Sequence, residues 1–140
     1  MTPIRARGSE SFGDAEEPVH YVLGGGHVGV AIAERLRADG HRNVTVDRSY
    51  RPGDVPGFVG DPTDPDVLSE AGIERASTVV VAMRSDRRNL LVAQLVRSRF
   101  DVPRIIAFVD DPDRCPLFTD AGNEPFCATT ALSEALGEVV

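Results

Sequence analysis

Three glycines between an apolar run and an amphipathic run constrain the fold of this chain more than any other feature. In the stretch YVLGGGHVGVAIAERLRADG, Gly24, Gly26 and Gly29 form the pattern G-x-G-x-x-G. Residues 19–23 before it are apolar and suit a short strand. Residues 28–39 after it repeat apolar side chains at helical spacing. A glycine pattern that follows a strand and opens a helix is typical of the first turn of a nucleotide-binding α/β sheet.

Each glycine has its own task in such a turn. Gly24 permits the tight turn, Gly26 lets the backbone approach a pyrophosphate, and Gly29 lets the helix pack close to the strand. The N–H groups at the start of the helix, at His27 and Val28, would then face the phosphates. The His27 side chain would either donate to a phosphate or simply be exposed at a helix start. A plain tight turn without a ligand is the alternative to nucleotide binding.

Asp47 ends the next strand, 43–47, and is placed to accept hydrogen bonds from both hydroxyls of a ribose. A carboxylate at this position repels a 2′-phosphate, so the sequence favours NAD or NADH over NADP. The neighbouring Arg48 weakens that preference, because an arginine here can accept a 2′-phosphate. The first helical turn has no arginine for a third phosphate. This favours a dinucleotide and leaves ADP or ATP as the alternative.

Strands and helices alternate along the rest of the chain. We expect strands at 58–60, 78–83, 104–109 and 124–128, and helices between Thr63 and Gly72 and at 86–99, 111–121 and 130–140, the last capped by Thr129 or Thr130. Alternation with short connections predicts right-handed βαβ units and a parallel sheet. The predicted fold class is therefore a Rossmann-like, doubly wound α/β fold with six strands in the order 3-2-1-4-5-6. Residues 1–17 are expected to be a flexible polar tail and residues 18–140 the domain.

The composition excludes several classes of function. All 15 basic residues are arginines, so the chain lacks the lysine of a P-loop, of a Schiff-base enzyme and of a Tyr-x-x-x-Lys dehydrogenase. The net charge of -7 disfavours a nucleic-acid partner. Cys115 and Cys127 are expected to be reduced core residues of a cytosolic protein. The histidines share no metal-ligand spacing, so no metal site is expected.

The segment from Gly60 to Pro112 resembles the N-terminal nucleotide-binding domain of potassium-transport regulators, the family known as RCK, KTN or TrkA-N. The residues that carry the resemblance are the run Gly60–Asp64, the pair Ala71–Gly72, the apolar strand at 78–83, the helix start Asn89–Leu90 and the strand 105–109. With the glycine loop and Asp47, the resemblance covers about residues 19–128.

The resemblance implies roles for residues on both sides of a bound nucleotide. Gly60 and Asp61 would lie beside the adenine, with Asp61 accepting from its amino group and Thr63 supporting the turn. From the residues alone, this run can also be a plain turn and helix cap. Asn89 is expected to cap or orient its loop and not to contact the ligand. The remaining positions would lie under the nucleotide or border its distal half: Ala82, Met83, Arg84 and Asp86.

The resemblance also implies a function and partners. The chain would be a regulatory module, not an enzyme, that binds NAD or NADH and controls a membrane potassium channel or transporter subunit. It would be cytoplasmic, held at the inner face of the membrane by that partner, and would form a homodimer or higher homo-oligomer. Pro116 falls inside the helix that contributes to pairing in the family, which departs from the usual pattern. Apolar residues of the last two helices point to an interface: Leu117, Phe118, Leu132, Leu136, Val139 and Val140.

Two alternatives to this function stay open. The chain could be a Rossmann-type nucleotide-binding module unrelated to ion transport. It could also be a small NAD-dependent oxidoreductase, although hydride transfer needs a substrate pocket and a positioned acid or base. The sequence beyond the sheet leaves little chain to build either. The family usually carries a C-terminal ligand-sensing domain as well, and we expect none within these 140 residues.

Overall fold

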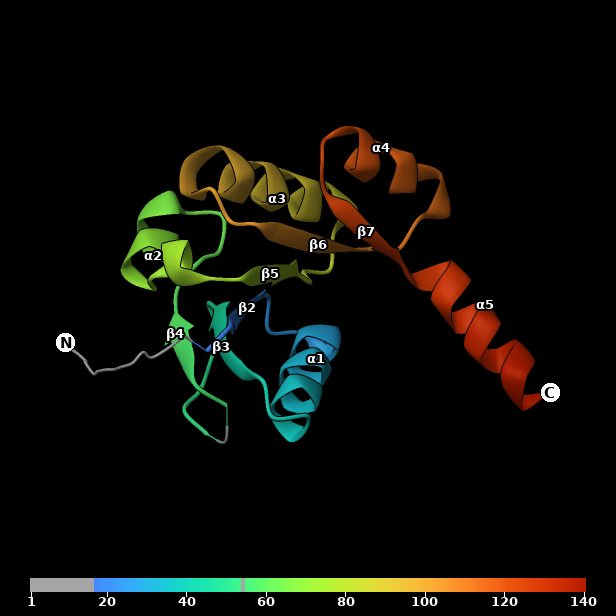
Figure 1. The fold of residues 1–140 in the computed structure, drawn as a ribbon, viewed down its shortest axis with the longest axis horizontal. Coiled ribbons are helices and arrows are strands. Elements are labelled where there is room, and N and C mark those ends of the chain that lie inside the picture. Colours follow the sequence, from blue (N-terminus) through green and yellow to red (C-terminus); the bar gives the residue numbers. More distant parts are fainter. Residues whose placement is uncertain (1–16, 54) are drawn as a thin grey trace.

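An all-parallel sheet organises residues 17–53 and 55–140, the part of the chain that the computed structural model describes (Figure 1). Its strands run in the order β4-β3-β2-β5-β6-β7, which confirms the predicted order 3-2-1-4-5-6. The tail expected at residues 1–17 lies, apart from Glu17, outside the described residues. The strands are β2 (Val19–Leu23), β3 (Arg42–Asp47), β4 (Gly57–Val59), β5 (Thr78–Val81), β6 (Arg104–Val109) and β7 (Glu124–Cys127).

Five α-helices and two short 3-10 helices connect or follow these strands in the described residues. Asp64 caps α2 by accepting from the N–H of Asp66, and Pro65 lies in the first helical turn. Ser85 caps α3 by accepting from the N–H of Arg88. The helices are α1 (His27–Ala38), α2 (Pro65–Glu70), η2 (Ile73–Arg75), α3 (Asp86–Phe100), η3 (Pro112–Arg114), α4 (Cys115–Asp120) and α5 (Ala128–Val139).

The start of the last helix differs from the prediction. The sequence predicted Thr129 or Thr130 as the cap, but α5 begins at Ala128, directly after the extended Cys127. The hydroxyl of Thr129 donates to the carbonyl of Asp110 at 3.3 Å. The side chain therefore joins α5 to the end of β6 and leaves the first turn of α5 without a side-chain cap.

Pro116 does not interrupt a helix. The segment after β6 forms the 3-10 turn η3 first, and α4 then begins at Cys115. Pro116 thus lies in the first turn of α4, where the missing N–H would have had no partner within the helix. The helix is shorter than predicted and begins at Cys115, so the proline lies at its start and not in its interior.

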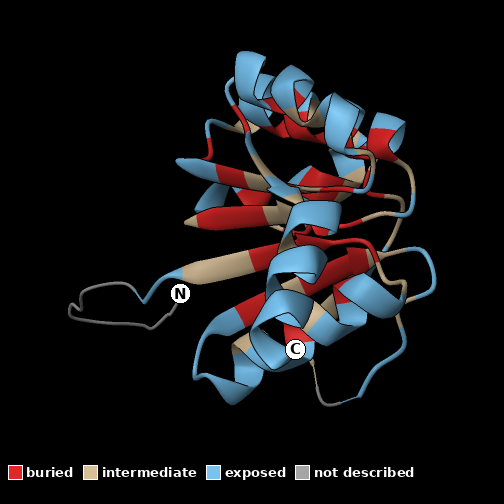
Figure 2. Cartoon of the chain, turned by 90° about the vertical axis from the view of Figure 1, so that its right-hand side faces the viewer, coloured by how far each residue is buried: buried red, intermediate tan, exposed pale blue. Residues whose placement is uncertain are grey.

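The hydrophobic core lies between one face of the sheet and the helices α2, α3 and α4 that cover this face (Figures 1 and 2). The hydroxyl of Tyr21 donates to the carbonyl of Ala71 at 2.7 Å and so joins β2 to the end of α2. Phe118, expected at an interface, is 1% exposed and belongs to this core, since α4 turns that side chain toward the sheet. The largest fully buried side chains are Tyr21, Phe118, Leu23, Leu68 and Ile73.

The opposite face of the sheet carries α1 but, in the described part of the chain, no helix over β6 and β7 (Figure 1). Side chains alternate between the two faces along a strand, so Ile106 and Phe108 of β6 point away from the core. Phe126 pairs in register with Phe108 and is 53% exposed. By contrast, Val22 lies on the α1 side of β2 and is fully buried. On this face, α1 therefore covers the middle of the sheet and leaves β6 and β7 without a helix over them in the described residues.

The two cysteines are not reduced core residues, which corrects the prediction. A disulfide joins Cys115, at the start of α4, to Cys127, at the end of β7, with their Cα atoms 6.4 Å apart. The sequence shows no motif that pairs the two cysteines. However, α4 runs back beside β7, which brings the start of the helix to the end of the strand.

Reduction of this disulfide should lower the free energy of unfolding by about 3 kcal/mol, because the bridge closes a short loop in the unfolded chain. The two cysteines are 12 residues apart. Urea unfolding with and without dithiothreitol would measure the loss. The double variant Cys115→Ser, Cys127→Ser should match the reduced protein and should not respond to dithiothreitol. Equal stability of the oxidised and reduced protein would contradict this expectation.

Candidate functional site

Two glycines of the first loop are required by close packing of the backbone. Gly24 has φ +123°, and a Cβ atom there would lie 2.6 Å from the carbonyl oxygen of Ala82. A Cβ atom on Gly29 would lie 2.1 Å from the carbonyl oxygen of Gly24. These contacts bring the start of α1 against the ends of β2 and β5. The fold itself therefore requires glycine at positions 24 and 29, whether or not a ligand binds.

Gly26 is different, because nothing in the protein backbone crowds it. Its backbone is extended, with φ -75° and ψ -172°, a conformation that any residue adopts. The nearest atom to a Cβ there would be Nε of the exposed Arg84, at 3.4 Å. The fold itself thus leaves open space over Gly26, and a glycine here keeps that space open.

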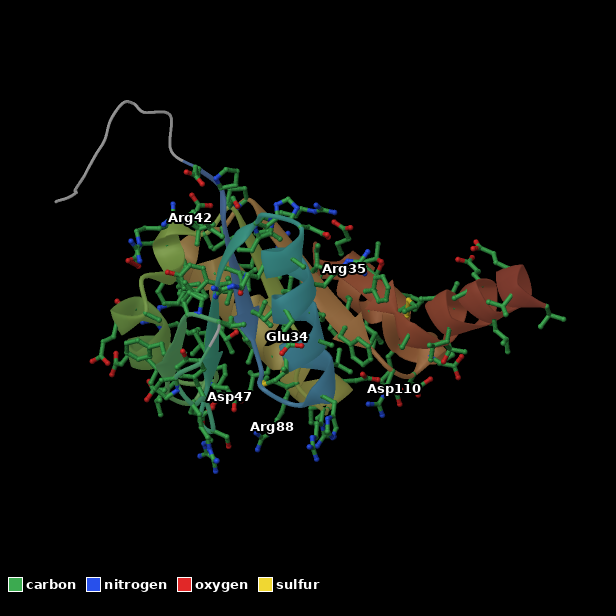
Figure 3. All side chains as sticks on the ribbon, turned by 90° about the horizontal axis from the view of Figure 1, so that it is seen from below. Glu34, Arg35, Arg42, Asp47, Arg88 and Asp110 are labelled. Carbon is green, nitrogen blue, oxygen red and sulfur yellow. A yellow bond between two sulfur atoms is a disulfide. The ribbon has the colours of Figure 1, made fainter. Side chains whose placement is uncertain are left out.

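A groove of about 560 Å³ opens beside this space, at the carboxyl ends of β2, β3 and β5. The chain leaves β2 toward β3 on one side and returns to β5 on the other, so this is the switch point where open α/β sheets bind ligands. In Figure 3, Asp47 and Arg88 lie near each other at this edge, and Arg42, at the start of β3, lies at the opposite edge. The groove is lined by Gly24, Gly25, Gly26, Asp47, Arg48, Ser49, Asp61, Pro62, Met83, Arg84, Ser85 and Arg88.

The Asp47 carboxylate binds the glycine loop from the end of β3. One oxygen accepts from the N–H of Gly25 at 2.9 Å, and the other accepts from the N–H of Ser49 at 2.8 Å. A Cβ atom on Gly25 would lie 2.6 Å from the carboxylate carbon of Asp47. Gly25, the middle glycine of the run GGG, therefore matters as much as the two glycines of the run that belong to the pattern. The presence of a third glycine between the two of the pattern was the sequence feature that could have predicted this contact.

Asp61 forms the wall of the groove next to Asp47. One carboxylate oxygen accepts from the N–H of Thr63 at 2.9 Å and from its hydroxyl at 2.8 Å, and the other lies 3.4 Å from Arg48. The N–H of Thr63 is the main cause that lowers the pKa of Asp61, helped by the hydroxyl and by Arg48 and opposed by burial. The carboxylate therefore stays charged at neutral pH, and Thr63 supports it from behind.

Asn89 holds the loop at the end of β5 in place. Its side-chain oxygen accepts from the N–H of Met83 at 2.8 Å, and its amide donates to the carbonyls of Met83 and Phe108 at 3.1 and 2.8 Å. The side chain is fully buried. Asn89 thus orients the loop that carries Met83 and Arg84, as expected, and does not face the groove.

Asp86 does not border the groove, contrary to the expectation for the distal half. Its carboxylate accepts from the N–H groups of Asp110 and Asp111 at 2.7 and 3.0 Å, and the residue is 8% exposed. These N–H groups follow the end of β6 and need acceptors. The carboxylate at the start of α3 is the group that satisfies them, so Asp86 joins two loops.

The structure brings seven of the predicted site residues into the groove and places six outside it. Those in the lining are Gly24, Gly26, Asp47, Arg48, Asp61, Met83 and Arg84, and those outside it are His27, Val28, Gly29, Gly60, Thr63 and Ala82. The side chains of His27 and Val28 are exposed on α1, whereas Gly29 and Ala82 are buried. The N–H of Gly60 donates to the carbonyl of Asp47, so this residue fixes the end of β3.

Five lining residues were missed: Gly25, Ser49, Pro62, Ser85 and Arg88. Arg87 and Arg88 are adjacent at the start of α3. Which of them faces the groove depends on where the helix begins, and it begins at Asp86. Ser49 lies beyond the predicted strand, in a turn whose direction the sequence left open. In the described residues, no group of three or more histidine, cysteine or acidic side chains could hold a metal ion.

Comparison with known proteins agrees with this geometry. A family model described as the TrkA-N domain matches residues 21–127. The Trk system potassium uptake protein TrkA of Azorhizobium caulinodans is 38% identical over 93 residues, which are 61% of this chain and 20% of that protein. A TrkA homolog of Methanothermobacter thermautotrophicus is 34% identical over 108 residues, 72% of this chain and 50% of that protein. This chain therefore spans half or less of the length of these relatives.

Solved structures of GsuK share the fold. The GsuK channel bound to NAD superposes with a TM-score of 0.79 at 25% identity, covering 89% of this chain and 23% of that one. GsuK bound to ADP gives a TM-score of 0.79 at 25% identity, covering 90% of this chain and 34% of that one. No helix within residues 17–53 and 55–140 is both long and apolar enough to span a bilayer. On the match over residues 21–127, the chain belongs to the TrkA-N domain family.

Proposed function

We propose that this chain is a nucleotide-binding regulatory module of potassium transport, with NAD or NADH as its favoured ligand. The observation that carries the proposal is the open space over Gly26 beside the Asp47 carboxylate, at the switch point of the sheet. The names of its relatives, potassium uptake proteins, supply the biological setting. The NAD-bound and ADP-bound GsuK structures support a nucleotide as the ligand class.

The groove offers a place for each part of a dinucleotide. The pyrophosphate would lie over Gly26, near the N–H groups at the start of α1. The ribose hydroxyls would donate to Asp47, whose oxygens have lone pairs beyond those used by Gly25 and Ser49. The adenine would lie toward Asp61 and Pro62. Arg84 and Arg88 would border the distal half, and ADP or ATP would fill only the first part of this arrangement.

The groove is suited to binding a nucleotide and offers little for transforming it. Its ionisable lining consists of two carboxylates and three arginines. Both carboxylates already accept hydrogen bonds from the backbone, and an arginine does not give up its proton at neutral pH. Hydride transfer needs a positioned acid or base. A regulatory module needs only different affinities for the ligand in two states, and this favours it over a small oxidoreductase.

Apolar surface on one side of the molecule supports assembly into a homodimer or higher homo-oligomer. The α5 helix extends away from the sheet (Figure 1), with Leu132, Leu136 and Val139 exposed by 70%, 63% and 82%. The sheet face over β6 and β7 also exposes Phe126. Surfaces of this kind mark interfaces. The assembly would act on a membrane channel or transporter subunit, from the cytoplasmic side of the membrane.

Three measurements on the pure protein test this function. Calorimetric titration with NAD, NADH, NADP, ADP and ATP should rank NAD or NADH first. Light scattering should give at least a dimer, and absorbance should show no NADH formed or consumed. A monomer that oxidised or reduced a small substrate at about 1 s⁻¹ or faster would overturn the proposal. A protein that binds nucleotide but co-purifies with no potassium channel or transporter subunit would instead favour a nucleotide-binding module unrelated to ion transport.

Replacing Asp47 by Arg should weaken NAD binding by about 1–3 kcal/mol, because it removes the charged acceptor of the ribose hydroxyls. NADP should bind the variant better than it binds the wild type. Asp47→Asn is the matched control, since it keeps the size and one acceptor oxygen, and it should lose less affinity. Calorimetry gives both values. Equal NAD affinity in wild type and Asp47→Arg would refute the ribose assignment.

A further inference from the structure

We propose that the Cys115–Cys127 disulfide is a thiol-exchange site whose state controls how firmly α5 is held at the end of the sheet. The pair lies outside the nucleotide groove, and nothing in the proposed binding function uses it. The exchange site stands on its own geometry. Only its effect on pairing between copies rests on the proposed function.

The disulfide is open to small molecules. Both cysteines are half-buried and line a surface hollow of about 450 Å³. The hollow lies between η3, α4 and the first turn of α5. Because both cysteines line this surface hollow, a small thiol that enters the hollow would meet the disulfide in the folded protein. The other lining residues are Pro112, Pro116, Thr119, Asp120 and Thr130.

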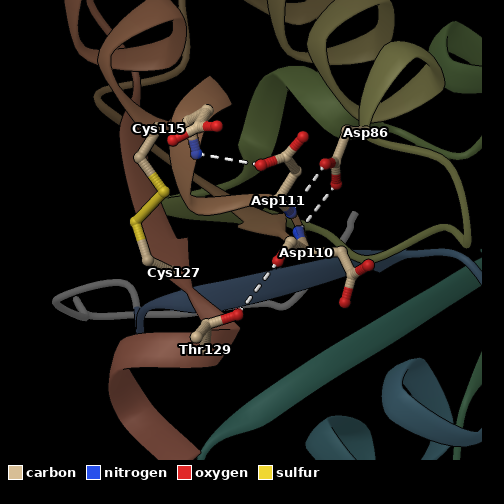
Figure 4. The surroundings of a disulfide bond; sticks show 7 residues. Asp86, Asp110, Asp111, Cys115, Cys127 and Thr129 are labelled. Atoms are coloured by element: carbon tan, nitrogen blue, oxygen red, sulfur yellow. Dashed lines mark hydrogen bonds between the residues drawn. A yellow bond between two sulfur atoms is a disulfide. The ribbon is translucent and has the colours of Figure 1, made fainter.

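The disulfide is also a principal anchor of α5. Cys127 directly precedes the helix, and Figure 4 shows it bonded across to Cys115. Ala128 is buried, but the exposed fraction rises beyond it, and the helix extends away from the sheet. Within the described residues, the one side-chain hydrogen bond from α5 to the rest of the protein is that of Thr129 to Asp110. Without the disulfide, α5 would be held by this bond, by the packing of Ala128 and by the pairing of Cys127 with Val109 in the sheet.

The exchange chemistry needs a low-molecular-weight thiol as the reductant. Its thiolate attacks the sulfur of one cysteine, the S–S bond breaks, and the other cysteine leaves as a thiolate that takes up a proton. A second thiol then attacks the mixed disulfide, which releases the small-molecule disulfide and leaves two protein thiols. Two electrons thus pass from the small thiols to the protein, and the oxidised small molecule can reverse the reaction.

Opening the bridge should loosen α5 while the sheet stays intact. The strand β7 keeps its pairing with β6, so the change is confined to α4, the junction at Cys127 and α5. The apolar residues Leu132, Leu136 and Val139 would then no longer be presented at a fixed angle. If α5 pairs two copies, reduction would weaken that pairing.

Amide hydrogen exchange over residues 128–139 tests the inference directly. The oxidised protein should protect this helix, and reduction with dithiothreitol in native buffer should speed its exchange by about tenfold or more. Alkylation in the same buffer should label neither cysteine before reduction and both after it. The double variant Cys115→Ser, Cys127→Ser should exchange like the reduced protein and should not respond to dithiothreitol.

Three results would overturn the inference. They are free thiols in the air-oxidised protein, reduction that succeeds only in denaturant, and unchanged exchange of α5 after reduction. Nucleotide titration of both redox states separates this inference from the proposed function. Loss of α5 protection in a protein that binds no nucleotide would leave the exchange site standing and would remove the nucleotide-binding proposal. Nucleotide binding with unchanged hydrogen exchange of α5 would support the nucleotide-binding proposal and overturn the thiol-exchange site.

Discussion

The Gly26→Val variant should bind NAD at least about a hundredfold more weakly than the wild type, a loss of roughly 2.7 kcal/mol or more, while its sheet stays folded. The backbone of Gly26 is extended, and the space above it is free of protein backbone. A valine side chain would occupy that space without a clash in the free protein. In the complex it would stand where the pyrophosphate has to lie.

The folded state should change little in this variant. Gly26 is the cap residue of α1, and valine is a poorer cap than glycine, which costs about 1 kcal/mol. Calorimetry measures the affinity and circular dichroism the fold. Gly137→Val is the matched control, since Gly137 also has open space around it but lies in α5. A folded Gly26→Val protein with wild-type affinity would mean that the glycines serve the turn alone.

The Gly29→Ala variant should instead lose stability. We expect its free energy of unfolding to fall by about 4 kcal/mol. The added Cβ atom would lie 2.1 Å from the carbonyl oxygen of Gly24. Gly24 cannot move away easily, because its N–H donates to the carbonyl of Val46 and the carbonyl oxygen of Ala82 lies only 2.6 Å from where a Cβ of Gly24 would stand. The whole start of α1 would have to shift off the sheet.

The intrinsic preference of a helix for alanine works against this loss but is smaller, about 1 kcal/mol. Gly137→Ala isolates that preference, since it makes the same substitution inside a helix with nothing within 4 Å. It should leave stability unchanged or raise it slightly. Urea unfolding compares the two variants. Equal stability of Gly29→Ala and wild type would show that α1 can slide along β2 without cost.

The sheet was predictable because its causes are local in sequence. A glycine loop between an apolar run and an amphipathic run predicts the first β-α unit, and the run Thr78–Met83 predicts a strand buried on both faces. The rules for parallel sheets then leave few topologies. The strand order 3-2-1-4-5-6 followed from these steps and is confirmed.

Details of the groove and of the last helices could not be predicted, because they depend on contacts between distant segments. Asp86 was assigned to the distal half of the groove by the family resemblance, but its carboxylate accepts from the N–H groups of Asp110 and Asp111 instead. The pairing of Cys115 with Cys127 depends on α4 running back beside β7. In each case the partner lies in another segment, and no periodicity in the sequence marks it.

The central position of β2 has a consequence for how the chain acquires its structure. The strand β2 is made first, but one of its two neighbours, β5, follows only after α1, β3, β4 and α2. The bond between Ser77 and Val19 at the start of that pairing spans 58 residues. At a synthesis rate of 5–20 residues per second, β2 would wait roughly 3–12 s for this partner. A nascent chain therefore exposes one edge of this central strand during translation, while β3, which is completed early, pairs with the other edge.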